Sequence, residues 1–311
     1  MATGRGYGKT ILFGEHFVVY GLAAIASALD SVTIADVKVI EGSGWIVNDQ
    51  RPATLGYKKK KYNEAMQSIQ NVIDYLKINT ENQKLNITFS GDLFAASGVG
   101  ASAAQCTSLS RALNKTFNLN LDDEKINEAA YEGEKAYHGT PSGIDNTIST
   151  YGGLIWFVKN LSGGKNTMDL LQSPKKIPLV IANTGITAST TKVVADVRRL
   201  KEESPEGFER IFKEYKNLAE NSRQALLKGD INTIGALMNK NHKLLQKITV
   251  SGEINDKLVK LTLSNGAIGA KLTGTGRGGL VIALTKDIET QDIVAKAVEK
   301  EGYDAWKTMI G

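Results

Sequence analysis

The feature that most constrains this chain is a run of small residues, SGVGASAAQCTSLSRALN, at residues 97–114. Apolar side chains alternate as in a strand at residues 85–89, and they recur at helical spacing over residues 106–113. Residues 98–104 are therefore predicted to form a strand-to-helix turn that carries almost no side chains. The unpaired N–H groups at such a helix N-terminus attract anions and allow a close approach, so a phosphate is the first candidate ligand.

The length of the chain and its periodic segments predict an α+β protein of two domains. Its 311 residues can bury a substantial core, and a domain commonly holds about 100–200 residues. The polar segment NLSGGKNT at residues 160–167 marks the boundary, so we expect domains at 1–174 and 175–311. The expected strands include residues 32–40, 177–183 and 279–284, in mainly antiparallel sheet, and the expected helices include residues 66–76, 208–219 and 289–301, with Asp230 capping another helix.

Charge, cysteine content and hydrophobicity exclude several classes of protein. The formal net charge of +5 suits an anionic ligand, but the lysines are scattered without the basic and aromatic pattern of a nucleic-acid-binding protein. The single cysteine, Cys106, excludes an internal disulfide framework and a cysteine-based metal site, and we expect it to pack in a core. No apolar run is long enough to span a bilayer and no targeting segment is recognised, so we expect a cytoplasmic protein without nucleic-acid or membrane partners.

Glycine-rich or charged turns occur at residues 8–21, 97–104 and 269–279. None of them has the spacing of a Walker A motif or of a dinucleotide-binding turn, so P-loop and Rossmann folds are excluded. A fourth segment, EGEKAYHGTPSGIDNTISTYGG at residues 132–153, supplies acidic side chains. Proline, serine and glycine just before Asp145 are expected to hold that carboxylate on a constrained turn.

In this order and at these distances, the three turns resemble the three motifs of the GHMP kinases, the superfamily of galactokinase, homoserine kinase, mevalonate kinase and phosphomevalonate kinase. GEHFVVYG and HGTPSGIDNTISTYGG resemble the mevalonate kinase branch, and NDQRPATLGY, GVGASAAQCTSLSRALN and GAKLTGTGRGG resemble its trypanosomatid form. The resemblance implies a ribosomal-protein-S5-like N-terminal domain and a ferredoxin-like C-terminal domain. It also implies ATP-dependent and Mg²⁺-dependent phosphorylation of the C5 hydroxyl of mevalonate, in isoprenoid biosynthesis. A homodimer is left open by the sequence.

The resemblance further implies a catalytic pair and a metal site. Asp145 matches the catalytic aspartate, which accepts the proton of the attacking hydroxyl or orients it, and Lys9 matches the lysine beside it. Ser102 and Glu134 match the Mg²⁺ ligands and supply the hard oxygens that this ion prefers. Phosphoryl transfer asks mainly for positioning and charge neutralisation, so these parts agree with the chemistry. Taken singly, a helix-capping serine is an equal interpretation of Ser102, while a turn acid and a surface lysine are the plainer interpretations of Asp145 and Lys9.

The nucleotide and the acceptor are each assigned a set of residues. The turn described first is expected to bind the ATP phosphates through Ser97, Gly98, Val99, Gly100, Ala101, Ser102 and Ala103. The resemblance implies substrate binding by Glu15, His16, Thr190 and Tyr151. His16 could donate a hydrogen bond to a carboxylate or hydroxyl of mevalonate, and the hydroxyl of Thr190 could support Asp145 or Lys9. An interior tyrosine bonded to backbone is an equal interpretation of Tyr151.

The chain departs from the usual family pattern at two places. Ala101 stands where the second motif usually has the first of two serines, and Gly274-Thr275-Gly276-Arg277-Gly278 replaces the usual glycine-alanine-glycine-glycine-glycine. Arg277 is expected to keep an ordinary backbone conformation, because a positive φ is costly for arginine. Its side chain is expected either to point to solvent, which is slightly favoured, or to reach anionic groups in the cleft. His138 is expected to support the turn before Asp145, and His242 either to line the cleft or to face solvent, both without a catalytic role.

Two other functions remain open at this point. Phosphomevalonate kinase or homoserine kinase would share the nucleotide site and differ in the acceptor pocket, but GEHFVVYG speaks against both. A sensor of the same fold would bind nucleotide without turnover. The joint presence of Lys9, Ser102, Glu134 and Asp145 argues against a sensor, because binding alone does not need a complete transfer apparatus.

Overall fold

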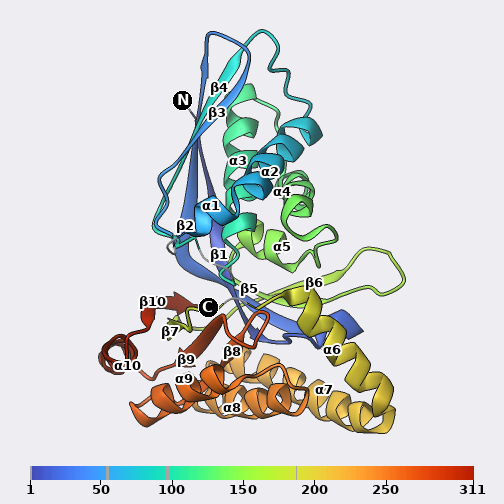
Figure 1. Ribbon diagram of the computed structural model, residues 1–311, viewed down its shortest axis with the longest axis vertical. Coiled ribbons are helices and arrows are strands. Elements are labelled where there is room, and N and C mark those ends of the chain that lie inside the picture. Colours follow the sequence, from blue (N-terminus) through green and yellow to red (C-terminus); the bar gives the residue numbers. More distant parts are fainter. Residues whose placement is uncertain (1, 54–55, 96–97, 187) are drawn as a thin grey trace. The chain divides into compact units, whose positions relative to one another are not determined.

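The computed structural model describes residues 2–53, 56–95, 98–186 and 188–311 (Figure 1). Backbone contacts divide the chain into a first unit of Met1–Lys9 with Ala28–Gly152, and a second unit of Thr10–Ser27 with Gly153–Gly311. This division differs from the boundary expected at residue 175. Its physical reason is strand pairing, since the Ala24–Ser27 segment of one strand pairs with Leu154–Phe157 of another in the second unit.

In the first unit, helices pack against a mixed sheet that contains both antiparallel and parallel strand pairs. Its strands are β1 (Ala2–Phe13, to Lys9), β2 (Ala24–Ile40, from Ala28), β3 (Gly44–Asp49) and β4 (Lys84–Ser90), and its helices are α1 (Tyr57–Lys60), α2 (Tyr62–Tyr75), α3 (Ala101–Phe117), α4 (Asp123–His138) and α5 (Ile144–Tyr151). β4 runs antiparallel to β2 and parallel to β3, so Ile87 lies opposite Val37 on one side and Val47 on the other. Helices α2, α3 and α4 gather against this sheet (Figure 1).

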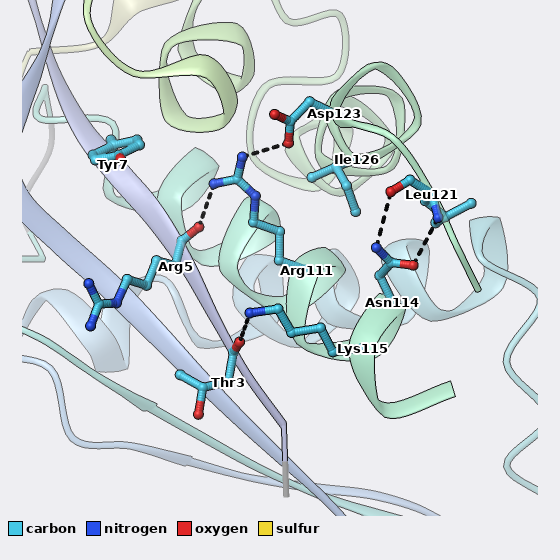
Figure 2. A pocket seen from close by; sticks show the side chains of 9 residues that line it. All are labelled: Thr3, Arg5, Tyr7, Arg111, Asn114, Lys115, Leu121, Asp123 and Ile126. Carbon is cyan, nitrogen blue, oxygen red and sulfur yellow. Dashed lines mark hydrogen bonds and ion pairs between the residues drawn. The ribbon is translucent and has the colours of Figure 1, made fainter. Parts of the chain in front are cut away.

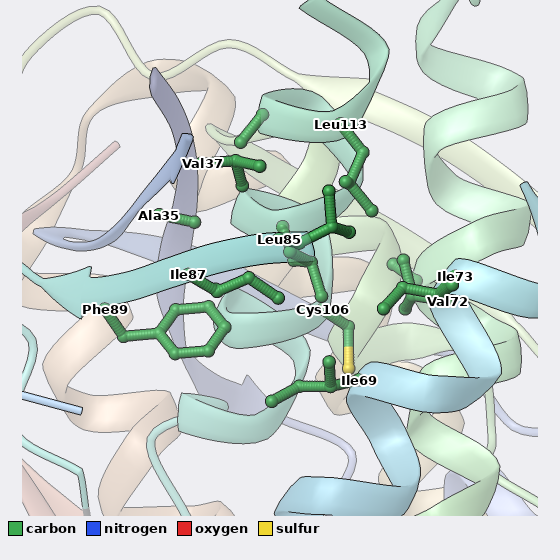
Figure 3. Packing of buried hydrophobic residues seen from close by; sticks show 13 residues of the cluster. Ala35, Val37, Ile69, Val72, Ile73, Leu85, Ile87, Phe89, Cys106 and Leu113 are labelled. Atoms are coloured by element: carbon green, nitrogen blue, oxygen red, sulfur yellow. The ribbon is translucent and has the colours of Figure 1, made fainter. Parts of the chain in front are cut away.

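One hydrophobic core joins the sheet and helices of the first unit (Figure 3). Ile87 and Phe89 of β4 point from the sheet toward α3, and Ile69 of α2 closes the core from the helix side. Cys106 is buried in this cluster, as expected, and burial raises the pKa of its thiol well above the ordinary value. The apolar residues that alternate at 85–89 and those at helical spacing over 106–113 therefore pack against each other in one core.

The second unit contains an antiparallel sheet in the order β10-β7-β9-β8. Its strands are β5 (Leu154–Val158), β6 (Thr167–Leu171), β7 (Ile177–Asn183), β8 (Gly269–Thr273), β9 (Leu280–Leu284) and β10 (Asp304–Ile310), and its helices are the short η1 (Val18–Tyr20), α6 (Thr190–Glu203), α7 (Pro205–Lys228), α8 (Ile231–Lys247), α9 (Glu253–Ser264) and α10 (Ile288–Lys300). Asp230 caps α8, as predicted, because its carboxylate accepts from the Thr233 N–H at 3.1 Å.

The α+β class and the mainly antiparallel pairing are confirmed, with β3 and β4 as the parallel exception among the strands described. Within the same described residues, no helix has both the length and the apolar character needed to cross a membrane.

Candidate active site

The turn that precedes α3 has the backbone geometry that a phosphate cradle requires. Gly98 and Gly100 have φ of +102° and +69°, in the region that favours glycine, and Gly100 is the N-cap of α3. Among the residues that the structure describes, no side chain caps this helix, so the first N–H groups, from Ala101 to Ala103, can bind a ligand. Ser97, the first of the residues expected to bind ATP, lies outside the described residues.

Lys9 packs directly against this turn. Its backbone N–H donates to the Val99 carbonyl at 2.8 Å, which ties β1 to the turn. A Cβ built on Gly100 would lie 2.6 Å from Cγ of Lys9, a distance that real side chains do not tolerate. Gly100 therefore serves two needs, a positive φ and room for the lysine stem.

Lys9 and Asp145 form an ion pair within the first unit. The Nζ of Lys9 lies 3.1 Å from Oδ1 of Asp145, and the lysine side chain is 5% exposed against 26% for the aspartate. Asp145 lies in the first turn of α5, whose N-cap Gly143 has φ of +89°. A carboxylate in that place is stabilised by the helix dipole as well as by the lysine.

Glu134 is buried and has no hydrogen-bond partner on either carboxylate oxygen among the residues described. Burial and, to a smaller extent, the nearby Asp145 raise its pKa to about 8, although Ser102 and Lys9 oppose the rise. The imidazole Nε2 of His138 is 3.7 Å from Oε2 of Glu134. A buried carboxylate left without a partner is costly and indicates that a cation belongs beside it.

These residues fit a Mg²⁺ ion that is held partly by nucleotide. Glu134 supplies two unused oxygens and Ser102 a hydroxyl nearby, and both are hard donors. Within the described residues, no cluster of three or more histidine, cysteine or acidic side chains could hold a metal. Mg²⁺ usually keeps waters and takes one or two carboxylates with substrate phosphates, so a small protein ligand set is what it needs.

Arg51 is a buried cation that the sequence did not point to. Its guanidinium donates to the Ala101 carbonyl at 3.1 Å, to Oε1 of Gln105 at 2.7 Å, and to both carboxylate oxygens of Asp49 at 3.0 and 2.7 Å. The bonds to Ala101 and Gln105 hold the first turn of α3 in place. The segment NDQRPATLGY carried no periodic signal for such a role, because the bonds join residues far apart in sequence.

Glu15 is held in a fully buried ion pair in the second unit. The Nζ of Lys271 lies 2.5 Å from Oε1 of Glu15 and 2.6 Å from the Leu272 carbonyl, and neither charged side chain is exposed. Burial raises the pKa of Glu15 and lowers that of Lys271, while their mutual attraction opposes both shifts. Glu15 therefore ties the GEH turn to β8, and substrate binding by its own carboxylate stays a prediction.

His16 follows Glu15 with an unusual backbone, at φ of +62°. Its Nε2 lies 2.8 Å from the Thr275 carbonyl, so this nitrogen carries the proton and donates. Burial lowers the pKa of His16, which keeps the ring neutral, and its buried Nδ1 has no partner among the residues described. A neutral ring in this tautomer offers an acceptor at Nδ1, whereas the sequence suggested a donor.

The remaining predicted residues are placed as follows. The Thr190 hydroxyl, at the start of α6, lies 2.7 Å from the Thr275 hydroxyl. Tyr151 ends α5 and is half-buried. His242 neither faces solvent nor is free, because it is buried with Nε2 3.0 Å from Oδ1 of Asp256.

The expected backbone conformation of Arg277 is wrong, and its side chain, although partly exposed, is bonded within the chain. Its φ is +50°, and its guanidinium donates to Asp196 at 2.5 Å and to the Thr249 carbonyl at 3.0 Å. These bonds and the one from its backbone N–H to the Val250 carbonyl at 2.8 Å outweigh the local preference against a positive φ.

A hollow of about 590 Å³ lies elsewhere in the first unit, between β1 and α3 (Figure 2). Arg111 spans it and donates to the Arg5 carbonyl at 3.0 Å and to Asp123 at 2.7 Å. Lys115 donates to the Thr3 carbonyl at 2.9 Å. None of the predicted site residues lines it, and its charges are largely paired within the chain.

Comparison with known proteins agrees with this geometry. The model of the GHMP kinases N-terminal domain matches residues 64–153, and that of the GHMP kinases C-terminal domain matches residues 222–304. The chain belongs to the GHMP kinase family. It is an ATP-dependent kinase, and the resemblance inferred from its three motifs is confirmed.

Relatives within this family share nearly the whole length of the chain. Mevalonate kinase of Thermococcus sibiricus is 31% identical over 94% of this chain and 91% of its own. A crystal structure of L. major mevalonate kinase in complex with R-mevalonate is 40% identical, with a TM-score of 0.96 over 100% of this chain and 96% of that chain. The Methanococcus jannaschii mevalonate kinase is 26% identical, with a TM-score of 0.83, and covers 99% and 98% of the two chains.

Proposed function

We propose that this kinase transfers the γ-phosphoryl group of ATP to the C5 hydroxyl of mevalonate, giving 5-phosphomevalonate for isoprenoid biosynthesis. The observation that carries the proposal is the Lys9–Asp145 ion pair beside a glycine turn, with the unpartnered carboxylate of Glu134 in the same unit. The mevalonate kinases to which the chain is similar over nearly its whole length support the choice of acceptor.

For the nucleotide, the N–H groups at the start of α3 would bind phosphate oxygens, with Gly98 and Gly100 allowing the close approach. Glu134 and Ser102 would hold Mg²⁺, which supplies charge neutralisation on the transferring group. Arg51 keeps the first turn of α3 in place through the Ala101 carbonyl and Gln105. The cradle is thus fixed before nucleotide arrives.

For the acceptor, Asp145 would accept a hydrogen bond from the C5 hydroxyl and orient its oxygen for in-line attack. Lys9 holds that carboxylate in one position and keeps a positive charge next to the reacting oxygen. We retain His16 as a predicted contact of the acceptor. We retain Thr190 and Tyr151 as contacts of the acceptor.

The test is an acceptor comparison with the purified protein. ADP release is followed with mevalonate, phosphomevalonate and homoserine at equal concentration, with ATP and Mg²⁺ present. We expect mevalonate to be phosphorylated at least about 100-fold faster, in kcat/KM, than the other two acceptors. A preference for another acceptor would overturn the proposal in favour of a different kinase of the family, and nucleotide binding without ADP release would favour a sensor. A homodimer and a cytoplasmic location stay predictions.

A further inference from the structure

Two residues of the third glycine turn, Thr275 and Arg277, contact α6 through their side chains. The Thr275 hydroxyl meets that of Thr190, the first residue of α6, and the Arg277 guanidinium meets Asp196, further along the same helix. The turn is therefore attached to α6 at two points.

Thr275 joins two of the residues assigned to substrate binding. Its carbonyl accepts from Nε2 of His16 at 2.8 Å, while its hydroxyl lies 2.7 Å from that of Thr190. An alanine could make only the first of these contacts, since the carbonyl belongs to the backbone. The hydroxyl of Thr275 is thus the feature that links the positions of Thr190 and His16.

The guanidinium of Arg277 makes three hydrogen bonds within the second unit. Nη1 donates to Oδ2 of Asp196 at 2.5 Å, Nε donates to the Thr249 carbonyl at 3.0 Å, and Nη2 donates to the Thr249 hydroxyl at 3.2 Å. The next residue, Gly278, is bracketed by Asn255, which accepts from its N–H at 2.8 Å and donates to its carbonyl at 2.7 Å. These bonds join the turn to Asn255 and Thr249, and the arginine joins the same turn to Asp196 of α6.

The helix has two kinds of further attachment. Val193 and Val197 are its buried residues, and near its C-terminal end Nζ of Lys201 lies 5.8 Å from the centre of the Tyr20 ring. The pair of Arg199 and Glu203, at 2.7 Å, joins the helix to itself and cannot fix it to a neighbour. The polar contacts with the third glycine turn add to these attachments of α6.

We propose that Thr275–Thr190 and Arg277–Asp196 form a clasp, here called the α6 clasp, that positions Thr190 and His16 for binding of the acceptor. Thr275, Arg277 and Asp196 are positioning residues, since they act through other side chains. The inference rests on the proposed function for the identity of the acceptor. The α6 clasp affects acceptor binding, and it leaves the nucleotide cradle of the first unit unchanged.

The kinetic test compares Arg277→Gly, Asp196→Asn and the double variant. Glycine adopts a positive φ without steric cost, so Arg277→Gly removes the guanidinium without straining the turn. We expect each single variant to raise KM for mevalonate roughly threefold to tenfold with KM for ATP within about twofold, and the double variant to add little, because both remove the same contact. Arg199→Ala is the matched control, since it breaks an ion pair on α6 outside the clasp. Equal effects from Arg199→Ala, or an unchanged KM for mevalonate, would overturn the inference.

Hydrogen exchange of α6 gives a second readout that needs no activity. The amides of the helix should exchange faster in Arg277→Gly and Thr275→Ala than in the parent, while the amides of α3 exchange at the parent rate. Unchanged exchange over α6 would overturn the clasp. If the parent leaves mevalonate unphosphorylated, the proposed function fails, and the exchange comparison still decides whether the clasp holds α6.

Discussion

Lys9 and Asp145 belong to β1 and α5 of the first unit, and they meet with Nζ 3.1 Å from Oδ1. The lysine is nearly buried and the aspartate a quarter exposed, so the carboxylate is anchored from inside and open on its other side. Because the same lysine packs against the turn before α3, the predicted catalytic carboxylate and the predicted phosphate cradle share one structural support.

Replacing Asp145 by asparagine should separate chemistry from binding. The amide keeps the shape of the side chain but loses the charge, so we expect kcat to fall roughly 10²-fold to 10⁴-fold with little change in ATP affinity. Steady-state kinetics and calorimetric titration with ATP measure the two quantities. Asp123→Asn is the control, because it breaks the Arg111 ion pair in the same unit away from the site. Near-parent turnover in Asp145→Asn would contradict its catalytic role.

Local sequence patterns predicted much of the secondary structure. The features that they did not predict depend on contacts between segments far apart in the sequence. The strand expected at residues 177–183 matches the bounds of β7, and Asp230 caps α8 because capping depends only on neighbouring residues. The role of Arg51 was missed and the conformation of Arg277 was predicted wrongly, because bonds to residues far away in the chain hold both side chains. A positive φ at Arg277 contradicts the local preference of arginine, and only the surrounding bonds explain it.

Gly100 should tolerate no side chain, because Lys9 occupies the space that its Cβ would need. Gly100→Ala places a methyl group against the stem of Lys9, so we expect the lysine to move and kcat to fall at least about tenfold. Gly163→Ala is the matched control, since Gly163 also has a positive φ but open space around its Cβ position. If the two variants lose the same stability but only Gly100→Ala loses kcat, the loss of kcat results from displacement of Lys9. Parent-like kcat in Gly100→Ala would show that the lysine has room.

The buried pair of Glu15 and Lys271 should behave as a structural unit. Glu15→Gln leaves the lysine ammonium buried without its counter-charge, and we expect it to cost about 3–5 kcal/mol of unfolding free energy. Lys271→Met alone should cost a similar amount, whereas the double variant should lose clearly less than the sum. Urea unfolding measures all three. Additive losses would mean that the two side chains act independently, and a rise in KM for mevalonate at parent stability would favour a direct substrate contact for Glu15.

Glu134→Gln should show whether the unpartnered carboxylate serves a metal. Loss of the charge should raise the Mg²⁺ concentration for half-maximal rate at least about tenfold, because the ion loses a charged ligand. Titration of Mg²⁺ at saturating ATP measures this change. Glu132→Gln, on the exposed side of the same helix, is the control. The same Mg²⁺ requirement in Glu134→Gln and in the parent would place the metal elsewhere.

The pH dependence of stability follows from the same carboxyl group. Its pKa is about 8 in the folded chain, against an ordinary value of 4.5 when unfolded, so the folded state retains a proton that the unfolded state has released. Without metal, the free energy of unfolding should therefore fall as pH rises from 4.5 to 8, and Glu134→Gln should lack this part of the decline. Urea unfolding in EDTA should show the variant gaining at least about 1 kcal/mol on the parent between the two ends of that window. Adding Mg²⁺ and ATP at the upper end should restore the parent, because the ionised carboxylate then has its partner. A constant difference between parent and variant across the window would mean that Glu134 ionises normally despite its burial.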